Sequence, residues 1–339
     1  RLLLNSYLQT NAPDIFAAGD MVEIEHRVNG KKVRIPLAGP ANRQGRIAAE
    51  NALGGHHPYK GALGTSVVRV FDAVAGTTGL SLKQALAQGI DADAVVVHKE
   101  HHTNYMPGAE TVSVMLIFDQ KTGIVLGGQT AGYKGADKRL DVIAIAAAAK
   151  LTVSELSDID FAYSPPIGTA NDALNMAAFT AENKLSGFSP SVTAAQLDAF
   201  VANKQPLFID VRDVFAFEKS HVEGSLHIPL ELLPQQLPAV SSDQLILVYD
   251  ETGKKGHQAL RTLKGAGFSN VVNLSGGHTS LQRQARGVGF QQLCLDLLPI
   301  ENKTTEKAEE KPVEKTTTQP SDNHSTLIVD VRTPEEFRT

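Results

Sequence analysis

The sequence predicts a multidomain protein in which an α+β region is followed by an α/β region. In the middle of the chain, strand-like segments adjoin one another, and the turn Thr122-Gly123 joins two of them as an antiparallel hairpin. Between residues 190 and 289, short apolar strands alternate with helical stretches, which indicates a parallel sheet flanked by helices. At 339 residues and 42% hydrophobic content, the chain is long enough for two or three such domains.

Residues 1–59 read as a strand, a loop and a helix. The segment DIFAAGD carries a short apolar strand to Gly19 and Asp20, and RQGRIAAENALGG is a helix closed by Gly54 and Gly55. These elements are too few for a whole domain, so we expect the end of a larger one. The chain opens without a methionine, and we interpret it as a fragment; whether a targeting segment precedes it stays open.

Residues 60–188 form the predicted α+β domain. Its strand candidates are SVVRVFDAV, AVVVHKE, TVSVMLIFD and IVLGGQTAG, and its helices are LKQALAQG, RLDVIAIAAAAKL and DALNMAAFTAENKL. Residues 189–290 form the α/β domain, with PLFIDV, LILVYD and NVVNLSG as strands of a parallel sheet. In LILVYDETGKKGHQALRTL we expect a strand over 245–249 and a helix that begins near His257.

The end of the chain differs in composition. Residues 291–325 include a stretch rich in Thr, Lys, Glu and Pro and poor in apolar residues, which predicts a tail and a disordered linker. Residues 326–339 contain LIVDVRTPEEF, which repeats the pattern of LFIDVRDVFAF from the α/β domain. We therefore expect the truncated start of a second copy of that domain.

Composition excludes several classes of function. A net charge of −5, with scattered basic residues, disfavours nucleic-acid binding. The single cysteine, Cys294, excludes an intrachain disulfide framework and a multi-cysteine zinc site, and it suits a reducing cytoplasm. We expect Cys294 to be an inert buried thiol. His101 and His102 should point to opposite faces of an extended segment, so no shared metal is expected. No apolar run is long enough to span a membrane.

The stretch TNAPDIFAAGD resembles the second FAD-binding motif of the pyridine nucleotide-disulfide oxidoreductases. The resemblance implies that Asp20, after Gly19, accepts a hydrogen bond from a ribityl hydroxyl of the flavin, for which a carboxylate is a suitable acceptor. It continues into PLAGPANRQGRIAAEN, where the family places the start of a helix against the pyrimidine side of the flavin. The implied lining residues are Leu37, Ala38, Pro40, Ala41 and Asn42. The alternative is an ordinary helix start with solvated Asn42 and Gln44.

The α+β domain resembles the dimerisation domain of the same family. HHTNYMPGAE and FAYSPPIGTANDALNMAAF narrow the resemblance to coenzyme A-disulfide reductases and related NADH oxidases. It implies that Tyr105 and Tyr163, supplied by the partner subunit, bind or protonate a coenzyme A thiolate, which a phenol is able to do. The alternative is that both are interface tyrosines that serve packing.

The α/β domain resembles a rhodanese domain, through LFIDVRDVFAFEKSHVEGSLHIPL and NVVNLSGGHTSL. Active members carry Cys-x-x-x-x-Arg in the loop after the central strand, where this chain has Asp250 and Lys255, with Gly253 and Lys254 between them. A carboxylate cannot form a persulfide, so the domain is expected to be inactive in sulfur transfer. Asp250 is expected to act as a helix N-cap, paired with Lys254 or Lys255; the alternative is a retained anion or partner site.

Together these resemblances imply part of an FAD-dependent NAD(P)H oxidoreductase that reduces coenzyme A disulfide, persulfide or polysulfide. The glycine-rich FAD loop, redox cysteine and NAD(P)H domain would lie on a missing N-terminal part, so this fragment is expected to be inactive alone. Implied partners are a second copy of the chain, coenzyme A or another small thiol, and a sulfur-carrier protein. Two alternatives remain: an NADH oxidase acting on oxygen or peroxide, and a non-catalytic dimerising and sulfur-carrier docking module.

Overall fold

The computed structural model describes residues 2–236 and 240–287, and for residues 285–287 it describes the backbone alone. Cys294, the predicted linker and the predicted second copy of the α/β domain lie outside these residues. No described helix is long and apolar enough to cross a membrane. Within the same ranges, no group of three or more His, Cys, Asp or Glu side chains is arranged to hold a metal ion.

The first region is a small sheet with one long helix. Strand β1 (Leu2–Leu3) pairs in parallel with β2 (Val22–Glu25), which pairs antiparallel with β3 (Lys32–Val33). Helix α1 (Ala38–Ala52) follows, and Gly54 after it has a positive φ of 93°. The helix is confirmed and begins earlier than RQGRIAAENALGG suggests. The strand expected in DIFAAGD is reduced to one antiparallel bridge between Phe16 and Gln9, because most of this segment is held by turns.

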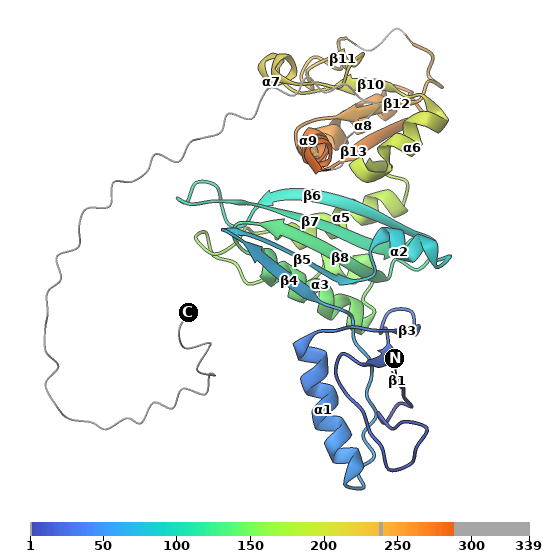
Figure 1. The fold of residues 1–339 in the computed structure, drawn as a ribbon. Coiled ribbons are helices and arrows are strands. Elements are labelled where there is room, and N and C mark those ends of the chain that lie inside the picture. The colour runs from blue at the N-terminus through green and yellow to red at the C-terminus, as the bar shows by residue number, and fades with distance from the viewer. Residues whose placement is uncertain (1, 237–239, 288–339) are drawn as a thin grey trace, which may run out of the picture. The chain divides into compact units, whose positions relative to one another are not determined.

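The middle region is an antiparallel sheet of five strands in the order β4-β5-β8-β7-β6 (Figure 1). The strands are β4 (Ser66–Val70), β5 (Ala73–Gly79), β6 (Ala92–Glu100), β7 (Thr111–Asp119) and β8 (Val125–Gly132). The predicted hairpin between β7 and β8 is confirmed, and Gly123 in its turn has a φ of 71°. Helix α2 (Leu82–Ala87) lies between β5 and β6 and starts with a capping box of Ser81 and Gln84.

One strand prediction in this sheet is wrong. SVVRVFDAV was expected as one strand, but it contains a tight hairpin: β4 ends at Val70, β5 starts at Ala73, and Val70 pairs with Ala73. The turn places Phe71 at a φ of 53°, in the left-handed region that disfavours a side chain. Because neither turn residue is a glycine or an asparagine, the usual sequence signal for a two-residue turn is missing.

Helices cover one face of this sheet, as Figure 1 shows for α3 (Ala136–Ala149) and α5 (Ala173–Leu185). Their alanine-rich faces allow close approach, and the core beneath them contains Val114, Leu116 and Phe118 of β7, all fully buried. The short helix α4 (Val153–Ser157) packs against α5 and starts with a capping box of Thr152 and Glu155.

The third region is a parallel sheet of five strands in the order β11-β10-β12-β13-β9, as predicted for an α/β domain. The strands are β9 (Ser191–Thr193), β10 (Leu207–Asp210), β11 (Leu226–His227), β12 (Ile246–Tyr249) and β13 (Val271–Ser275). The helices are α6 (Ala194–Lys204), α7 (Val214–Lys219), α8 (Lys254–Gly265) and α9 (Gly277–Gly287).

Both faces of the parallel sheet are buried, as alternation along β12 shows. Ile246 and Val248 pack with Leu260 of α8, whereas Leu247 and Tyr249 pack with Leu197 of α6 and Leu281 of α9. All four β12 residues are fully buried. A strand buried on both sides is continuously apolar, which is why LILVY reads as an unbroken run.

The edge strand β6 of the antiparallel sheet is covered by side chains from the parallel-sheet region. The Ser275 hydroxyl accepts from the Val96 N–H at 2.8 Å and donates to the Val96 carbonyl at 3.0 Å. Gln196 Nε2 donates to Asp93 Oδ1 at 3.0 Å, and Lys184 pairs with the same carboxylate at 2.7 Å. Polar groups at this edge that would otherwise face water are therefore satisfied within the chain.

Candidate functional site

The Gly19–Asp20 turn is tied to helix α1. Gly19 has a positive φ of 87°, and its N–H donates to Gln44 Oε1 at 2.8 Å. Gln44 is almost fully buried, at 1% exposed, and its amide nitrogen also contacts the Tyr59 hydroxyl at 3.4 Å. The alternative that Gln44 is solvated is wrong. Because of this bond, Asp20 and the start of α1, which the sequence places 18 residues apart, belong to one local structure.

The start of α1 keeps its backbone donors free of side-chain caps. Leu37 is the N-cap residue and makes no side-chain cap bond, and the first turn contains no acidic residue. Pro40 is buried, whereas Ala38, Asn42 and Asp20 are exposed. Uncapped N–H groups at the positive end of a helix stabilise negative charge on a neighbouring group. This donor set fits the pyrimidine edge of a flavin, and the exposed Asp20 carboxylate fits a sugar hydroxyl.

The two candidate tyrosines lie on loops that touch. Tyr105 follows β6 and is 70% exposed, and Tyr163 precedes α5 and is 47% exposed. Thr103 links the loops, since its N–H donates to the carbonyls of Pro165 at 3.3 Å and Gly168 at 3.0 Å. Because both tyrosines are exposed, their phenols lie outside the core and are available to a second molecule.

The histidines before Tyr105 are placed differently from the prediction. His101 and His102 lie just beyond the end of β6, and their ring centroids are 4.2 Å apart, so they do not point to opposite faces. The reason is that the alternation of an extended strand stops at Glu100. His101 Nδ1 accepts from the Glu110 N–H at 3.0 Å, which closes the base of the Tyr105 loop.

In the rhodanese-like loop, the Asp250 carboxylate occupies the amide cradle itself. It accepts from the N–H groups of Gly253 at 2.6 Å, Lys255 at 3.1 Å and Thr252 at 3.3 Å. Asp250 is only 3% exposed. The donors that would hold a thiolate or an incoming anion are therefore used by the protein's own side chain.

Details of the predicted loop need correction. Helix α8 begins at Lys254 rather than near His257, and its N-cap residue is Gly253, not Asp250. Asp250 still satisfies donors of the loop and of the first helical turn, because the loop curls back over its carboxylate. The Lys255 ammonium pairs with Glu231 at 3.6 Å, and only the Lys255 backbone reaches Asp250.

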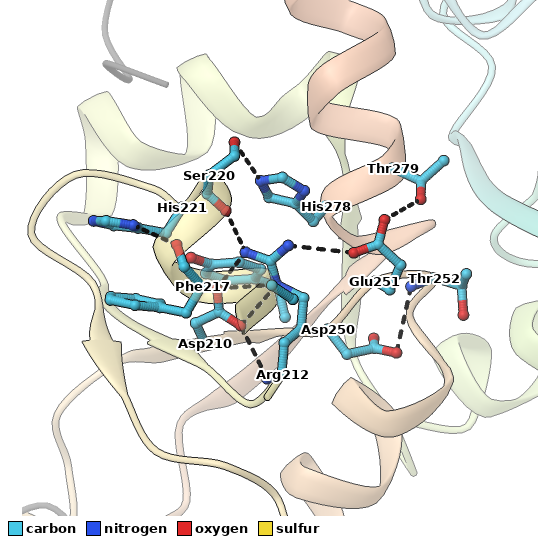
Figure 2. A network of polar contacts seen from close by, with 12 residues as sticks. Asp210, Arg212, Phe217, Ser220, His221, Asp250, Glu251, Thr252, His278 and Thr279 are labelled. Atoms are coloured by element: carbon cyan, nitrogen blue, oxygen red, sulfur yellow. Dashed lines mark hydrogen bonds and ion pairs between the residues drawn. The ribbon is translucent and has the colours of Figure 1, made fainter. Parts of the chain in front are cut away.

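A buried polar network lies beside this loop (Figure 2). Arg212 binds Asp210 through two of its nitrogens, Nη2 at 2.7 Å and Nε at 3.0 Å, and donates to the Ser220 carbonyl at 2.6 Å. Its third nitrogen contacts Glu251 at 3.2 Å. The forked geometry of guanidinium suits such a bidentate pair. The network joins β10 to Glu251, the residue next to Asp250. It therefore fixes the loop, and the charge of Arg212 is already paired within the protein.

His278 completes this network from the start of α9. Its Nε2 lies 3.2 Å from the Ser220 hydroxyl, and its Nδ1 is buried without a partner among the described residues. Burial, together with the positive charge of Arg212, lowers the pKa of His278 to about 4. His278 is therefore neutral near pH 7 and adds no charge to the loop.

Sequence reasoning missed the residues that hold these sites together. Gln44, Thr103 and Arg139 make contacts between segments far apart in the chain. For Arg139 a signal exists: it shares the helical stripe of the buried residues Ile143, Ala146 and Ala147. A charged residue on such a stripe needs a buried partner. Gln44 and Thr103 carry no comparable signal.

Two protein families match separate parts of this chain. Residues 65–173 match the family described as the pyridine nucleotide-disulphide oxidoreductase dimerisation domain. Residues 193–284 match the rhodanese-like domain. The first match spans the five strands of the antiparallel sheet, and the second spans β10 to β13 of the parallel sheet.

Comparisons with solved structures and with curated proteins find several relatives. The crystal structure of reduced Bacillus anthracis CoADR-RHD is 37% identical, has a TM-score of 0.79 and is matched over 84% of this chain and 51% of its own. A NAD-dependent persulfide reductase from A. fulgidus is 32% identical, has a TM-score of 0.73 and is matched over 81% of this chain and 50% of its own. The coenzyme A disulfide reductase of Staphylococcus haemolyticus is 31% identical over 181 residues, which are 53% of this chain and 41% of that protein. The chain thus spans about half the length of these relatives.

Proposed function

Because this chain combines a dimerisation domain of the pyridine nucleotide-disulphide oxidoreductases with a rhodanese-like domain, we propose that it is the C-terminal part of an FAD-dependent reductase of coenzyme A disulfide, persulfide or polysulfide. The observation that carries the proposal is the pair of exposed tyrosines, Tyr105 and Tyr163, on loops joined at Thr103. The names of the similar proteins, a coenzyme A disulfide reductase and a persulfide reductase, agree with this substrate class.

In the complete enzyme, FAD would pass electrons from NAD(P)H to a disulfide. Asp20, after Gly19, would hold the sugar-alcohol chain of the flavin, and the start of α1 would line its pyrimidine edge with Leu37, Ala38, Pro40, Ala41 and Asn42. The N–H groups of Ala38 and Gly39 would be the donors there, because Pro40 has no N–H and Ala41 donates to the Leu37 carbonyl. The nicotinamide site and the redox cysteine would belong to the half of the relatives that this chain does not span. On this proposal, the chain alone is inactive, and its single cysteine suits a cytoplasmic location.

Tyr105 and Tyr163 would act on the sulfur that leaves. A phenol donates a hydrogen bond to a thiolate, or gives it a proton, as a small thiol is released. Because both side chains point away from the core of their own chain, they would serve the flavin site of a second copy. The expected assembly is therefore a homodimer with two shared sites.

For the rhodanese-like domain we propose a docking role rather than sulfur transfer. Asp250 supplies no sulfur nucleophile, and its carboxylate uses the donors of the loop. The domain would then present the coenzyme A thiol, or a sulfur-carrier protein, to the reductase without reacting itself.

The test uses the full-length protein loaded with FAD. We expect NAD(P)H oxidation that depends on coenzyme A disulfide or a coenzyme A persulfide, and a fall in that rate for Tyr105→Phe and Tyr163→Phe. Reduction of ferricyanide by the same variants is the control, because it bypasses the disulfide. If NAD(P)H is oxidised as fast with oxygen alone as with the disulfide, and the tyrosine variants do not change that rate, the result would instead favour an NADH oxidase.

A further inference from the structure

The Tyr105 loop and the Tyr163 loop are joined by one threonine. In addition to the two backbone contacts of Thr103, its side-chain hydroxyl donates to the Pro165 carbonyl at 2.7 Å. Thr103 lies two residues before Tyr105, and Pro165 lies two residues after Tyr163. The link therefore joins the backbone within two residues of each tyrosine.

A buried ion pair fixes the bases of the same two loops. Arg139 of α3 forms a bidentate pair with Asp172, with Nη2 to Oδ2 at 2.6 Å and Nε to Oδ1 at 3.1 Å. Arg139 also donates to the carbonyl of His101, at the start of the Tyr105 loop, at 3.1 Å. Both charged side chains are at most 5% exposed. One guanidinium thus connects the start of the first loop to the end of the second.

Asp172 and Asn175 fix the Tyr163 loop at its two ends. Asp172 is the N-cap residue of α5 and forms a capping box with Asn175. The Asn175 amide then donates to the carbonyls of Ser157 and Ile159, both at 3.0 Å. These two residues lie where the Tyr163 loop begins. The loop is therefore closed into a ring, so Tyr163 has little freedom to drift relative to α5.

We propose that Thr103 and Arg139 are positioning residues that hold Tyr105 and Tyr163 in one fixed arrangement for the leaving thiol. This inference rests on the proposed function, in which both phenols act at one sulfur. A side chain on an exposed loop keeps a productive position relative to a reacting atom only if the neighbouring backbone is held in place. Small displacements of the hydroxyl from the sulfur weaken proton transfer. A buried ion pair is weak evidence for net stability, so we assign to the Arg139–Asp172 pair the role of selecting one arrangement of the two loops.

The main test compares Thr103→Val with Thr103→Ser in the full-length, FAD-loaded enzyme. Valine replaces the hydroxyl that reaches Pro165 with a methyl group of similar size, whereas serine keeps the hydroxyl and loses the threonine methyl group. For Thr103→Val we expect kcat for coenzyme A disulfide to fall about fivefold, the value of one typical hydrogen bond. Thr103→Ser should recover most of the rate, and ferricyanide reduction should be unchanged in both.

A second measurement needs no activity. Hydrogen exchange of the chain, followed by mass spectrometry, should show faster exchange in residues 101–110 and 158–171 for Thr103→Val and for Arg139→Lys. Lysine keeps the charge but loses the forked contact with Asp172 and His101. Exchange in the buried strands β7 and β8 should stay the same in Thr103→Val.

Each other outcome has a definite meaning. If Tyr105→Phe slows the disulfide reaction but Thr103→Val does not, the positioning role is overturned and the proposed function stands. If Thr103→Val slows ferricyanide reduction equally, or loosens β7 and β8, Thr103 has only a general structural role. If neither tyrosine variant affects the disulfide reaction, the proposed function itself fails.

Discussion

His98 Nε2 and Ser280 Oγ lie 2.8 Å apart, one on edge strand β6 and the other on helix α9. The opposite ring nitrogen of His98 contacts the Ser113 hydroxyl at 2.9 Å and an Arg283 nitrogen at 3.3 Å. Because arginine only donates, this Nδ1 is unprotonated, and the proton is on Nε2, where it is donated to Ser280. Burial, and secondarily the charge of Arg283, lower the pKa of His98 to about 4.

This relationship predicts a pH dependence of stability. The unfolded chain takes up a proton at His98 near pH 6.5, whereas the folded chain does so only near pH 4, so stability falls as the pH drops through this window. At pH 4, the lowered pKa of His98 reduces the free energy of unfolding by on the order of 3 kcal/mol relative to neutral pH. Urea unfolding of the parent and of His98→Gln at several pH values measures it. A slope from pH 6.5 to 4 that is identical in the two proteins would contradict this assignment, since His278 contributes equally to both.

The glycine pair at the start of α9, Gly276 and Gly277, predicts a strong positional effect. A methyl group on Gly277 would lie 2.5 Å from the Asp250 carbonyl and 2.7 Å from the Thr252 nitrogen, at a φ of 55°. Gly267 also has a positive φ, 97°, but a methyl group added there would meet no atom within 4 Å. Gly267→Ala should lower the free energy of unfolding by about 1 kcal/mol, because of its backbone conformation alone. Gly277→Ala should lower it by clearly more, because the added methyl group also clashes with the loop. Equal losses in thermal unfolding would show that the loop yields to the added methyl group.

Asp250→Cys tests whether the loop still stabilises an anion. In a Cys294→Ser background, we expect the new thiol to have a pKa below the usual value of about 8.5, because the three N–H groups that bond Asp250 are fixed by the backbone. Alkylation rate as a function of pH gives the pKa. The parent chain should show no thiosulfate sulfurtransferase activity. A thiol pKa at or above the usual value would mean that the donors depend on the carboxylate to hold them.

Asp20→Ala should weaken FAD binding in the full-length protein by about 1 to 3 kcal/mol, as expected for a lost hydrogen bond in a polar site. Asp14→Ala is the control, because Asp14 is exposed in the same loop and has no proposed flavin contact. Flavin retention after gel filtration and titration of the apoprotein measure the effect. Unchanged affinity in Asp20→Ala would remove Asp20 from the site.

The full-length protein should be a symmetric dimer at micromolar concentration. The reason is that Tyr105 and Tyr163 are exposed on their own chain and are proposed to complete the site of another. Light scattering gives the mass, and mixing the slowed Tyr105→Phe subunits with inactive subunits that lack the redox cysteine tests site sharing. Recovered activity in the mixture is expected. A monomer with full activity would exclude shared sites.

Much of the fold could be predicted from local patterns. The parallel sheet was predicted because short apolar strands alternate with helical stretches, and α5 was predicted from the segment DALNMAAFTAENKL. The β4–β5 turn was missed because Phe71 adopts a conformation that its residue type disfavours. Strand β5 also pairs with β8, a contact between distant segments that no local pattern reports.

The candidate sites were only partly predictable. Motifs identified Asp20, Tyr105, Tyr163 and Asp250, but they could not give the contacts that orient them. Gln44 lies 25 residues from Gly19, and Arg139 lies 33 residues from Asp172, so these bonds exist only after the chain has folded. The start of α8 was misplaced because Gly253 and Gly256 both look like helix breakers, yet Gly256 lies inside the first turn, where it leaves room for Asn273.

The hydrogen bonds that Ser275 makes with the edge strand β6 have a consequence for proteolysis of this protein. Cleavage near Pro190 would separate the antiparallel sheet from the residues that occupy the N–H and carbonyl of Val96. The released fragment would carry a nine-residue strand with an open edge, of the kind that recruits further strands and leads to aggregation. The rhodanese-like domain would then keep its neighbour from aggregating, an effect that does not depend on whether it transfers sulfur.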